Sequence, residues 1–387
     1  MRILFLVYRD LRNPSSVGGD IYLGELARGL SRRGHTITLI SSMFKGAQQR
    51  EDFDGVKVIR VRGLFKLPFK VYSGYLNWAK NRFDIVVEEA IGGQRPPFLA
   101  SLYVREPLVA VWHQKNDRIF REQYPFPLAL FLTAFEKIMA LLYRNRILIT
   151  PSLGAKEKIL ELGLKKERVK VVYNGVGHAF KQAKKNEKRQ NTIVCLGKLR
   201  RYKRFDHALL AFQRVLPRTS KSCKLVIAGK VSEIDRGYVE WLRRLAVNLG
   251  IQEDVEFRLN ISESEKLELL QKAKVLIQPS PIEGFGIVVI EANSCGTPVI
   301  VSSGVPNDVV VDGYNGFVYS YGNLNTLSSK IVGLIEDNAL WDRTSKNAYD
   351  WAQRFSWKKS ALEFEEILYS VASDKLRKHN FENRTEK

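Results

Sequence analysis

The chain has 387 residues, which is long for one ordinary domain core and suits two domains. Hydrophobic residues make up 45% of it and charged residues 27%, a balance typical of globular proteins that excludes a disordered or low-complexity chain. The net charge of +21 favours an anionic partner, which composition alone leaves open between nucleic acid, a phosphorylated small molecule and acidic lipid.

Neither the start of the chain nor its most apolar window is predicted to enter or cross a membrane. The opening MRILFLVYRD has a short apolar run and no small-residue cleavage site, unlike a secretory signal. The window from Phe126 to Tyr143 contains Glu136 and Lys137, and charges are costly in the middle of a bilayer. Three cysteines without a C-x-x-C pair form no disulfide framework, which suits a reducing cytoplasm.

The first half begins with the elements of a doubly wound α/β domain. Arg2–Tyr8 is an apolar strand, a loop containing Gly18 and Gly19 follows, and an amphipathic helix is predicted from about Asp20 to Arg33. The next strand, His35–Ser41, completes a βαβ unit. The loop lacks the G-x-G-x-x-G spacing, and no acid ends the second strand, so a nicotinamide dehydrogenase is disfavoured. Gly18 and Gly19 could cradle a phosphate or only make a tight turn.

Two later segments of the first half have more than one reading. Asp52-Phe53-Asp54 is formally D-x-D, a metal-binding pattern, but Asp54-Gly55 before the strand VKVIRV indicates a turn. Between Arg60 and Arg82, aromatic residues at spacings of three and four form one helical stripe, which predicts a core-facing helix. The interleaved bases also suit an anionic membrane surface, and both readings stay open; the stripe comprises Phe65, Phe69, Tyr72, Tyr75 and Trp78, beside Lys66, Lys70 and Lys80.

His113 ends the apolar strand LVAVWH, and ligands of open α/β sheets bind at the carboxyl ends of the strands. Because imidazole titrates near neutrality, His113 could shuttle a proton or bond a hydroxyl; the alternative is a capped strand end. No two histidines have metal-ligand spacing, so no metal site is predicted.

The second half repeats the alternation of strands and helices after a polar linker, Phe180–Asn191. A strand at Thr192–Gly197 precedes a basic loop and a helix from Phe205 to Leu216. Later, Ser262 and Glu265 form a capping box at the start of a helix.

The stretch PSPIEGFGIVVIEANSCGTPVIV, from Pro279 to Val301, carries the most specific pattern in the chain. A strand ends at Ser280, a glycine-rich turn follows, and a helix starts near Ile287, so the first helix amides could face a diphosphate. Glu283 and Glu291 flank this turn and could accept hydrogen bonds from sugar hydroxyls; the alternative is a helix entry with surface carboxylates.

These residues resemble the GT4 family, the group 1 glycosyltransferases of GT-B fold, in its E-x7-E motif. Other motifs occur in the family's order: Gly18-Gly19, R-R-G-H at 32–35, N-G-V at 174–176, G-K-L-R-R-Y-K-R-F-D at 197–206 and D-G-Y-N-G-F at 312–317. The resemblance covers nearly the whole chain. It implies two Rossmann-like domains facing each other across a cleft, with an acceptor-side domain at 1–173, a nucleotide-sugar domain at 174–354, and a C-terminal helix, 355–387, that returns to the first domain.

The resemblance also implies roles for individual residues. His113, Lys203 and Glu283 are the expected catalytic residues, with Glu283 at the transferred sugar and Glu291 at the ribose. Lys198 and Lys203 are expected to hold the diphosphate, although the family usually has arginine at position 198. Phe285 is included in the donor-binding set but is expected to pack in the turn more than to contact the donor. The full expected donor-binding set is Gly18, Gly19, Lys198, Lys203, Glu283, Gly284, Phe285, Gly286, Ile287, Val288 and Glu291.

The implied activity is retaining transfer of a hexosyl group from a UDP- or GDP-linked sugar to a hydroxyl of a lipid-linked or saccharide acceptor. No cofactor and no metal are expected. The expected location is the cytoplasm, with peripheral contact at the inner face of the cell membrane. The alternatives are a nucleotide-sugar epimerase or phosphorylase on the same fold, and a basic nucleic-acid-binding protein, which is disfavoured because the bases are spread along the chain.

Overall fold

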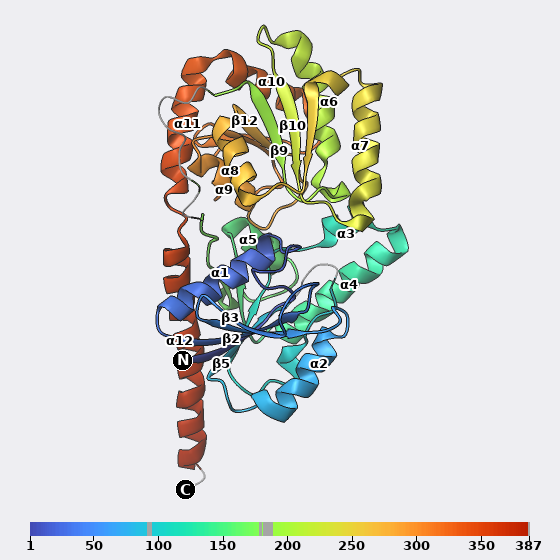
Figure 1. Ribbon diagram of the computed structural model, residues 1–387. Helices are drawn as coiled ribbons and strands as arrows, with labels where there is room; N and C mark the ends of the chain where they lie inside the picture. The colour runs from blue at the N-terminus through green and yellow to red at the C-terminus, as the bar shows by residue number, and fades with distance from the viewer. Residues whose placement is uncertain (91–94, 178–179, 181–188, 386–387) are drawn as a thin grey trace. The chain divides into compact units, whose positions relative to one another are not determined.

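The computed structural model describes residues 1–90, 95–177, 180 and 189–385. The chain divides into two compact units (Figure 1). The first unit comprises Met1–Asn116, Leu132–Gly175 and Ser356–Lys387, and the second comprises Asp117–Phe131 and Val176–Phe355. The boundaries predicted from the sequence, after residues 173 and 354, lie next to the limits at Gly175 and Phe355. They place Asp117–Phe131 in the first domain, whereas this segment groups with the second unit. Most of the expected linker, Phe180–Asn191, lies outside the described residues.

The first unit is built on an eight-stranded sheet in the order β3-β4-β2-β1-β5-β6-β7-β8. Every neighbouring pair is parallel except β3 with β4, which are antiparallel. The inner strands are short, almost wholly buried runs of aliphatic residues, as a sheet covered on both faces requires. The strands are β1 (Arg2–Leu6), β2 (Thr36–Ser42), β3 (Arg50–Phe53), β4 (Val56–Val61), β5 (Ile85–Glu89), β6 (Leu108–Val111), β7 (Ile147–Thr150) and β8 (Val169–Val171).

Helices cover both faces of this sheet. On one face, α1 (Gly18–Arg32) and α12 (Trp357–Thr385) enclose a core with the odd-numbered residues of β1. On the other face, α2 (Leu67–Gly74), the single π-helical turn η1 (Tyr75–Ala79) and α4 (Phe126–Tyr143) enclose a second core. The remaining helices of this part of the chain are α3 (Asp117–Gln123) and α5 (Leu153–Leu160). Gly18 and Gly19 are the first residues of α1, whereas the sequence placed them in a loop before it.

The second unit has a six-stranded, wholly parallel sheet in the order β11-β10-β9-β12-β13-β14. The strands are β9 (Thr192–Leu196), β10 (Lys224–Gly229), β11 (Val255–Leu259), β12 (Val275–Gln278), β13 (Val299–Ser302) and β14 (Gly316–Tyr319). The helices are α6 (Phe205–Val215), α7 (Arg236–Asn248), α8 (Glu263–Lys272), α9 (Ile287–Ser294), α10 (Leu324–Glu336) and α11 (Asn338–Ala352). The predicted capping box at the start of α8 is confirmed, since Ser262 and Glu265 bond reciprocally.

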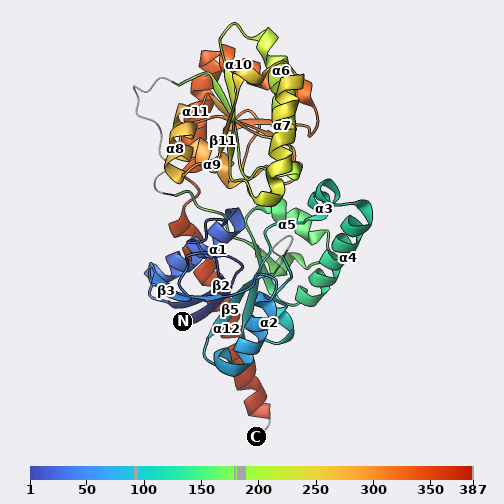
Figure 2. The same ribbon diagram turned by 45° about the vertical axis from the view of Figure 1, so that its right-hand side comes forward.

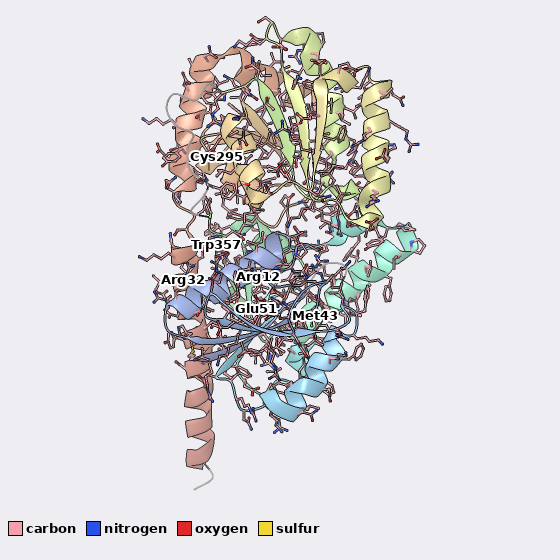
Figure 3. The ribbon with its side chains drawn as sticks, in the orientation of Figure 1. Arg12, Arg32, Met43, Glu51, Cys295 and Trp357 are labelled. Atoms are coloured by element: carbon pink, nitrogen blue, oxygen red, sulfur yellow. The ribbon has the colours of Figure 1, made fainter. Side chains whose placement is uncertain are left out.

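The D-x-D residues form part of a hairpin, as the turn reading predicts. Asp54 and Gly55 have φ of 52° and 77° and connect β3 to β4. Asp54 pairs with Arg28 at 2.6 Å. Glu51 of β3, which Figure 3 labels together with Arg12, accepts bonds from Arg12 and Arg60 at 2.8 and 2.7 Å. These acids therefore stabilise the edge of the sheet.

The aromatic stripe of residues 60–82 divides between core and solvent, so the expectation of one core-facing stripe is wrong. Tyr75 is 3% exposed, whereas Phe65, Phe69 and Tyr72 are 70%, 75% and 46% exposed. The reason is the helix register, because Leu67, Val71 and Ala79 share the buried side with Tyr75. The side chain of Trp78 lies outside the described residues.

Helix α4 is 18 residues long, and its hydropathy of 1.6 makes it long and apolar enough to cross a membrane. Length and composition alone are weak evidence, because core helices of globular proteins meet the same criterion. Here Met139, Ala140 and Tyr143 belong to the core of the first unit. The buried Glu136 carboxylate accepts a bond from the Asn116 amide at 2.9 Å, which also fixes the loop after β6.

Candidate active site

The turn before α9 requires glycine at position 286. Gly286 has φ of 86° and is the N-terminal cap of the helix. The preceding loop is fixed by the Glu283 amide, which donates to the Gly304 carbonyl at 3.0 Å. A Cβ on Gly304 would lie 2.3 Å from the Pro281 carbonyl, so the two loops are in close backbone contact. The first-turn amides of a helix have no acceptor inside it, which leaves this helix start suited to an anion.

Glu283 and Lys203 form an ion pair within the second unit, with Lys203 Nζ 2.5 Å from Glu283 Oε1. Gln278 donates to the same oxygen at 2.7 Å. Burial by itself lowers the pKa of Lys203, but the Glu283 carboxylate outweighs burial, and the pKa is raised overall. Lys203 is therefore an ammonium at neutral pH, with three N–H donors on one nitrogen.

Glu291 has a partner that sequence reasoning missed. Lys266 of α8 lies 2.9 Å from Glu291 Oε1, and also 2.7 Å from Glu263. Burial raises the pKa of Glu291, and Lys266 opposes that rise without cancelling it. Glu291 Oε2 is buried and has no hydrogen-bond partner among the described residues. Such an oxygen can accept a hydrogen bond from a hydroxyl group, at little cost because it is already desolvated.

The basic residues of the loop 197–206 differ in the residues that they contact. Arg204 bonds Asp206 and the Tyr321 hydroxyl, each at 2.8 Å, and so fixes the start of α6. Arg200 lies 3.4 Å from Asp235. Lys198 follows Gly197 directly, where a Cβ on Gly229 would lie 1.8 Å from the Gly197 oxygen. The carboxyl ends of β9 and β10 therefore meet closely at the base of this loop.

Two residues of the family motifs have buried side chains that make structural contacts. Phe285, expected among the donor-binding residues, is 4% exposed and packs edge-to-face on Phe355 at 5.5 Å. The physical reason is the turn at Gly286, which directs the phenyl ring into the core of the unit. Asn315 is fully buried and donates to the Asn293 side chain at 2.7 Å, so it ties the D-G-Y-N-G-F loop to α9.

His113 and Gly19 lie together in the first unit, although the sequence separates them by most of a domain. A Cβ on Gly19 would lie 2.9 Å from His113 Nε2. That nitrogen is buried, has no hydrogen-bond partner among the described residues and lies 4.0 Å from Glu89. Burial lowers the pKa of His113 to about 4. Burial therefore favours a neutral, hydrogen-bonding imidazole at pH 7 over the titration near neutrality that the sequence predicts.

A buried charged cluster beside His113 was also missed. Arg95 lies 3.0 Å from Asp20 and 3.7 Å from Glu89, and Asp20 also accepts a bond from the amide of Val17 before α1. Burial raises the pKa of Glu89, while Arg95 opposes that rise. The available signal was the pair of acids that ends the apolar strand DIVVEE, since acids at a strand end are placed at the ligand edge of the sheet.

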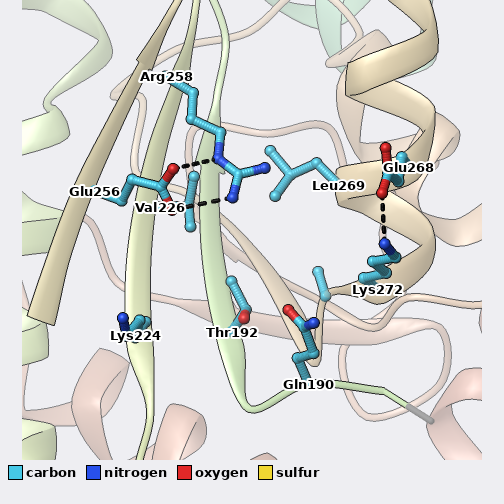
Figure 4. A pocket seen from close by; sticks show the side chains of 10 residues that line it. Gln190, Thr192, Lys224, Val226, Glu256, Arg258, Glu268, Leu269 and Lys272 are labelled. Carbon is cyan, nitrogen blue, oxygen red and sulfur yellow. Dashed lines mark hydrogen bonds and ion pairs between the residues drawn. The ribbon is translucent and has the colours of Figure 1, made fainter.

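A pocket of about 390 Å³ lies elsewhere in the second unit, between α8 and the strands β9 to β11 (Figure 4). Thr192 and Lys224, the first residues of β9 and β10, line it, so it reaches the amino ends of the strands. Besides Lys224, its charged side chains form two ion pairs, Glu256 with Arg258 at 2.7 Å and Glu268 with Lys272. The E-x7-E residues follow the carboxyl end of β12 instead, so this pocket is not the candidate active site.

Solved structures share the fold of this chain. Sucrose-phosphate synthase from Thermosynechococcus elongatus matches with a TM-score of 0.79 and 18% identity, over 97% of this chain and 100% of that one. Anabaena HepE in complex with UDP and glucose matches with a TM-score of 0.77 and 20% identity, over 96% and 100%. These similarities establish the GT-B fold that the sequence predicts.

Sequence relatives are named as glycosyltransferases. D-inositol 3-phosphate glycosyltransferase of Streptomyces bingchenggensis is 28% identical over 73% of this chain and 66% of its own length. A glycosyltransferase of Methanocaldococcus jannaschii is 25% identical over 93% of this chain and 96% of its own. The family model Glycosyltransferase Family 4 matches residues 17–180, and the model Glycosyl transferases group 1 matches residues 178–351. The chain therefore belongs to the family 4, group 1 glycosyltransferases.

Proposed function

We propose that this glycosyltransferase moves a hexosyl group from a UDP- or GDP-linked sugar to a hydroxyl of a lipid-linked or saccharide acceptor, with retention of anomeric configuration. The observation that carries the proposal is the arrangement around α9. A glycine-capped helix start lies between two buried carboxylates, each bonded to a lysine from another element. Similar proteins support the class of donor, since HepE was solved with UDP and with UDP-glucose.

In this proposal the second unit binds the donor. The amides of Gly286, Ile287 and Val288 and the ammonium of Lys203 bind the diphosphate, with Lys198 at the base of the same loop. The unpartnered Oε2 of Glu291 accepts a ribose hydroxyl, and Glu283 contacts the transferred sugar. Negative charge grows on the diphosphate as the glycosidic bond breaks, and a fixed ammonium stabilises that charge in the transition state. The chemistry proposed for these residues needs no metal and no cofactor.

The first unit contributes His113 in this proposal. Because burial holds the pKa of His113 near 4, its neutral Nε2 exchanges a hydrogen bond with a hydroxyl and does not act as an acid near pH 7. The acceptor proton passes to the departing phosphate on the same face of the sugar, which gives retention without a covalent enzyme intermediate. We propose a cytoplasmic location. Nucleotide sugars are available there, and a reducing compartment keeps the three buried cysteines as free thiols.

A thermal-shift screen with UDP-, GDP-, ADP- and TDP-sugars tests the donor class. One nucleotide should raise the melting temperature and the others should not. Product anomers analysed by NMR then test retention. Free epimerised sugar nucleotide, or dependence on inorganic phosphate, would point to an epimerase or a phosphorylase instead. Salt-sensitive retention of nucleic acid without any sugar-nucleotide binding would contradict the proposal as a whole.

A further inference from the structure

The face of the first unit formed by α2, α4 and the segment between them exposes large apolar side chains. Their exposed fractions run from 49% for Leu76 to 75% for Phe69. We call this set the docking face; it comprises Phe65, Phe69, Leu76, Leu102, Ile138 and Leu141. Isolated exposed apolar residues are common on proteins, but several on adjoining elements mark an interaction surface.

Contacts within the unit join these elements. The rings of Tyr72 on α2 and Tyr103, beside Leu102, are 5.0 Å apart. The Ser101 hydroxyl donates to the Leu142 carbonyl of α4 at 3.0 Å. Both helices contribute to the same buried core, and Figures 1 and 2 show the C-terminal end of α4 close to α2. The docking face is therefore continuous from α2 through Leu102 to the C-terminal half of α4.

The exposed charge along the segments that form the docking face is basic. Near Leu102, Glu106 is 5% exposed and accepts bonds from Tyr75 and the Asn81 amide. Between Gly55 and Phe83 the sequence contains no acid. Between Tyr124 and Lys156 the one acid is Glu136, which is 1% exposed and bonded to Asn116. The exposed bases along these segments include Arg62, Lys66, Lys70, Arg82, Lys137 and Arg144. An apolar surface bordered by bases without acids is complementary to a bilayer with anionic headgroups.

The packing of α4 fits a helix that lies on a bilayer rather than across it. Met139 and Tyr143 are fully buried in the core of the unit. Glu136 holds both the backbone and side-chain amides of Asn116, at 2.9 and 2.8 Å. A membrane-spanning α4 would have to break these bonds and expose the core, whereas insertion of the docking face alone leaves them intact.

We propose that this face docks the enzyme on an anionic membrane surface, with the apolar side chains among the acyl chains and the bases at the headgroups. A second copy of the chain is a poorer occupant. A symmetric dimer through this face would place the same bases against one another, without acids to compensate them. The proposal is independent of which sugar the enzyme transfers.

Vesicle co-sedimentation of the full chain tests the proposal. The parent should bind vesicles containing one third phosphatidylglycerol and should not bind pure phosphatidylcholine. Binding should fall as salt rises from 0.1 to 0.5 M, because the headgroup attraction is screened. Surface docking would be overturned if the parent protein does not bind anionic vesicles, or if washing with carbonate does not release the bound protein from them.

Two variants divide the apolar and the charged contributions. The apolar variant is Phe69→Ser/Ile138→Ser/Leu141→Ser, and the charge variant is Lys66→Gln/Lys70→Gln/Lys137→Gln. Each should weaken vesicle binding at least tenfold. The apolar variant loses side chains that would insert among the acyl chains, and in the charge variant each lost base removes about a fivefold contribution. Both sets change exposed side chains, so the melting temperature and donor binding should stay close to the parent's.

Matched controls carry the same changes away from the face. Ile234→Ser/Trp241→Ser/Val247→Ser and Lys166→Gln/Lys224→Gln/Lys346→Gln replace exposed residues elsewhere, and binding should stay within twofold of the parent. Equal losses in control and test variants would reduce the effect to net charge and overturn the proposal. The proposal is also overturned if the variant Phe69→Ser/Ile138→Ser/Leu141→Ser abolishes a dimer in solution while its vesicle binding is unchanged.

Discussion

The two candidate regions of this enzyme differ in how their buried charges are balanced. In the second unit, Glu283 and Glu291 each have a lysine partner, Lys203 and Lys266, on a different element. In the first unit, Asp20 and Glu89 share Arg95, and His113 stays neutral beside them. The lysine–glutamate pairs of the second unit suit a ligand that is negatively charged and gains more negative charge in the transition state. The cluster of the first unit, with its neutral imidazole, suits an uncharged hydroxyl group, which needs a hydrogen-bond partner and no opposite charge. Four predictions test this comparison.

The largest expected effect is from Lys203→Ala. Turnover should fall by about a hundredfold or more, because in the proposed reaction the leaving diphosphate loses its fixed cation and Glu283 loses its ammonium partner. Steady-state kinetics should show the loss mainly in kcat. Arg201→Ala, an exposed base in the same loop, is the control and should stay within about threefold. Activity of Lys203→Ala within threefold of the parent would move this charge out of the reaction.

Glu291→Gln should weaken donor binding by about ten- to a hundredfold, the range for a lost charged acceptor of about 1.5–3 kcal/mol. Titration calorimetry with the sugar nucleotide measures it. Glu263→Gln is the matched control, since Glu263 contacts the same lysine but is 70% exposed. If both variants bind alike, Glu291 acts through Lys266 and not through its open oxygen.

Gly19→Ala should lower turnover about tenfold by displacing His113, because the new methyl group would lie 2.9 Å from Nε2. Donor affinity should change less than turnover, because most of the expected donor-binding residues lie in the second unit. Gly237→Ala, where a methyl group meets nothing within 4 Å, controls for the change of residue. Unchanged turnover in Gly19→Ala would show that the position of His113 does not matter to the reaction.

The smallest expected effect is in the pH profile. With the pKa of His113 lowered to about 4, protonation of this imidazole should cause no loss of activity between pH 8 and 5.5. A folded-state pKa below the unfolded value also means that His113 lowers stability as pH falls from about 6.5 to 4. NMR titration of His113, with His113→Asn to assign the signal, measures the pKa on which both expectations rest. A midpoint near 6.5 would contradict the neutral-imidazole interpretation.

Much of the fold and part of the site could be predicted from the sequence. The alternation of aliphatic strands with amphipathic helices follows from local periodicity, as does the cap at Ser262. The glycine turn before α9 is visible because only a residue without a side chain accepts φ of 86° easily. The order of the family motifs then predicted Lys203, Glu283 and Glu291 as site residues, and the structure pairs Lys203 with Glu283.

Only the tertiary structure decided what surrounds these residues. No local rule connects Lys266 with Glu291, or Gly19 with His113, because parallel sheets bring the ends of distant strands together. Burial, which depends on every neighbouring element, lowered the pKa of His113 and placed Phe285 in the core. The register of α2 and the following turn η1 likewise exposed Phe69 and buried Tyr75, although both continue one sequence pattern. The sequence by itself thus determined which residues lie at strand ends and helix starts, while the packed fold decided which of them meet, which are charged and which face solvent.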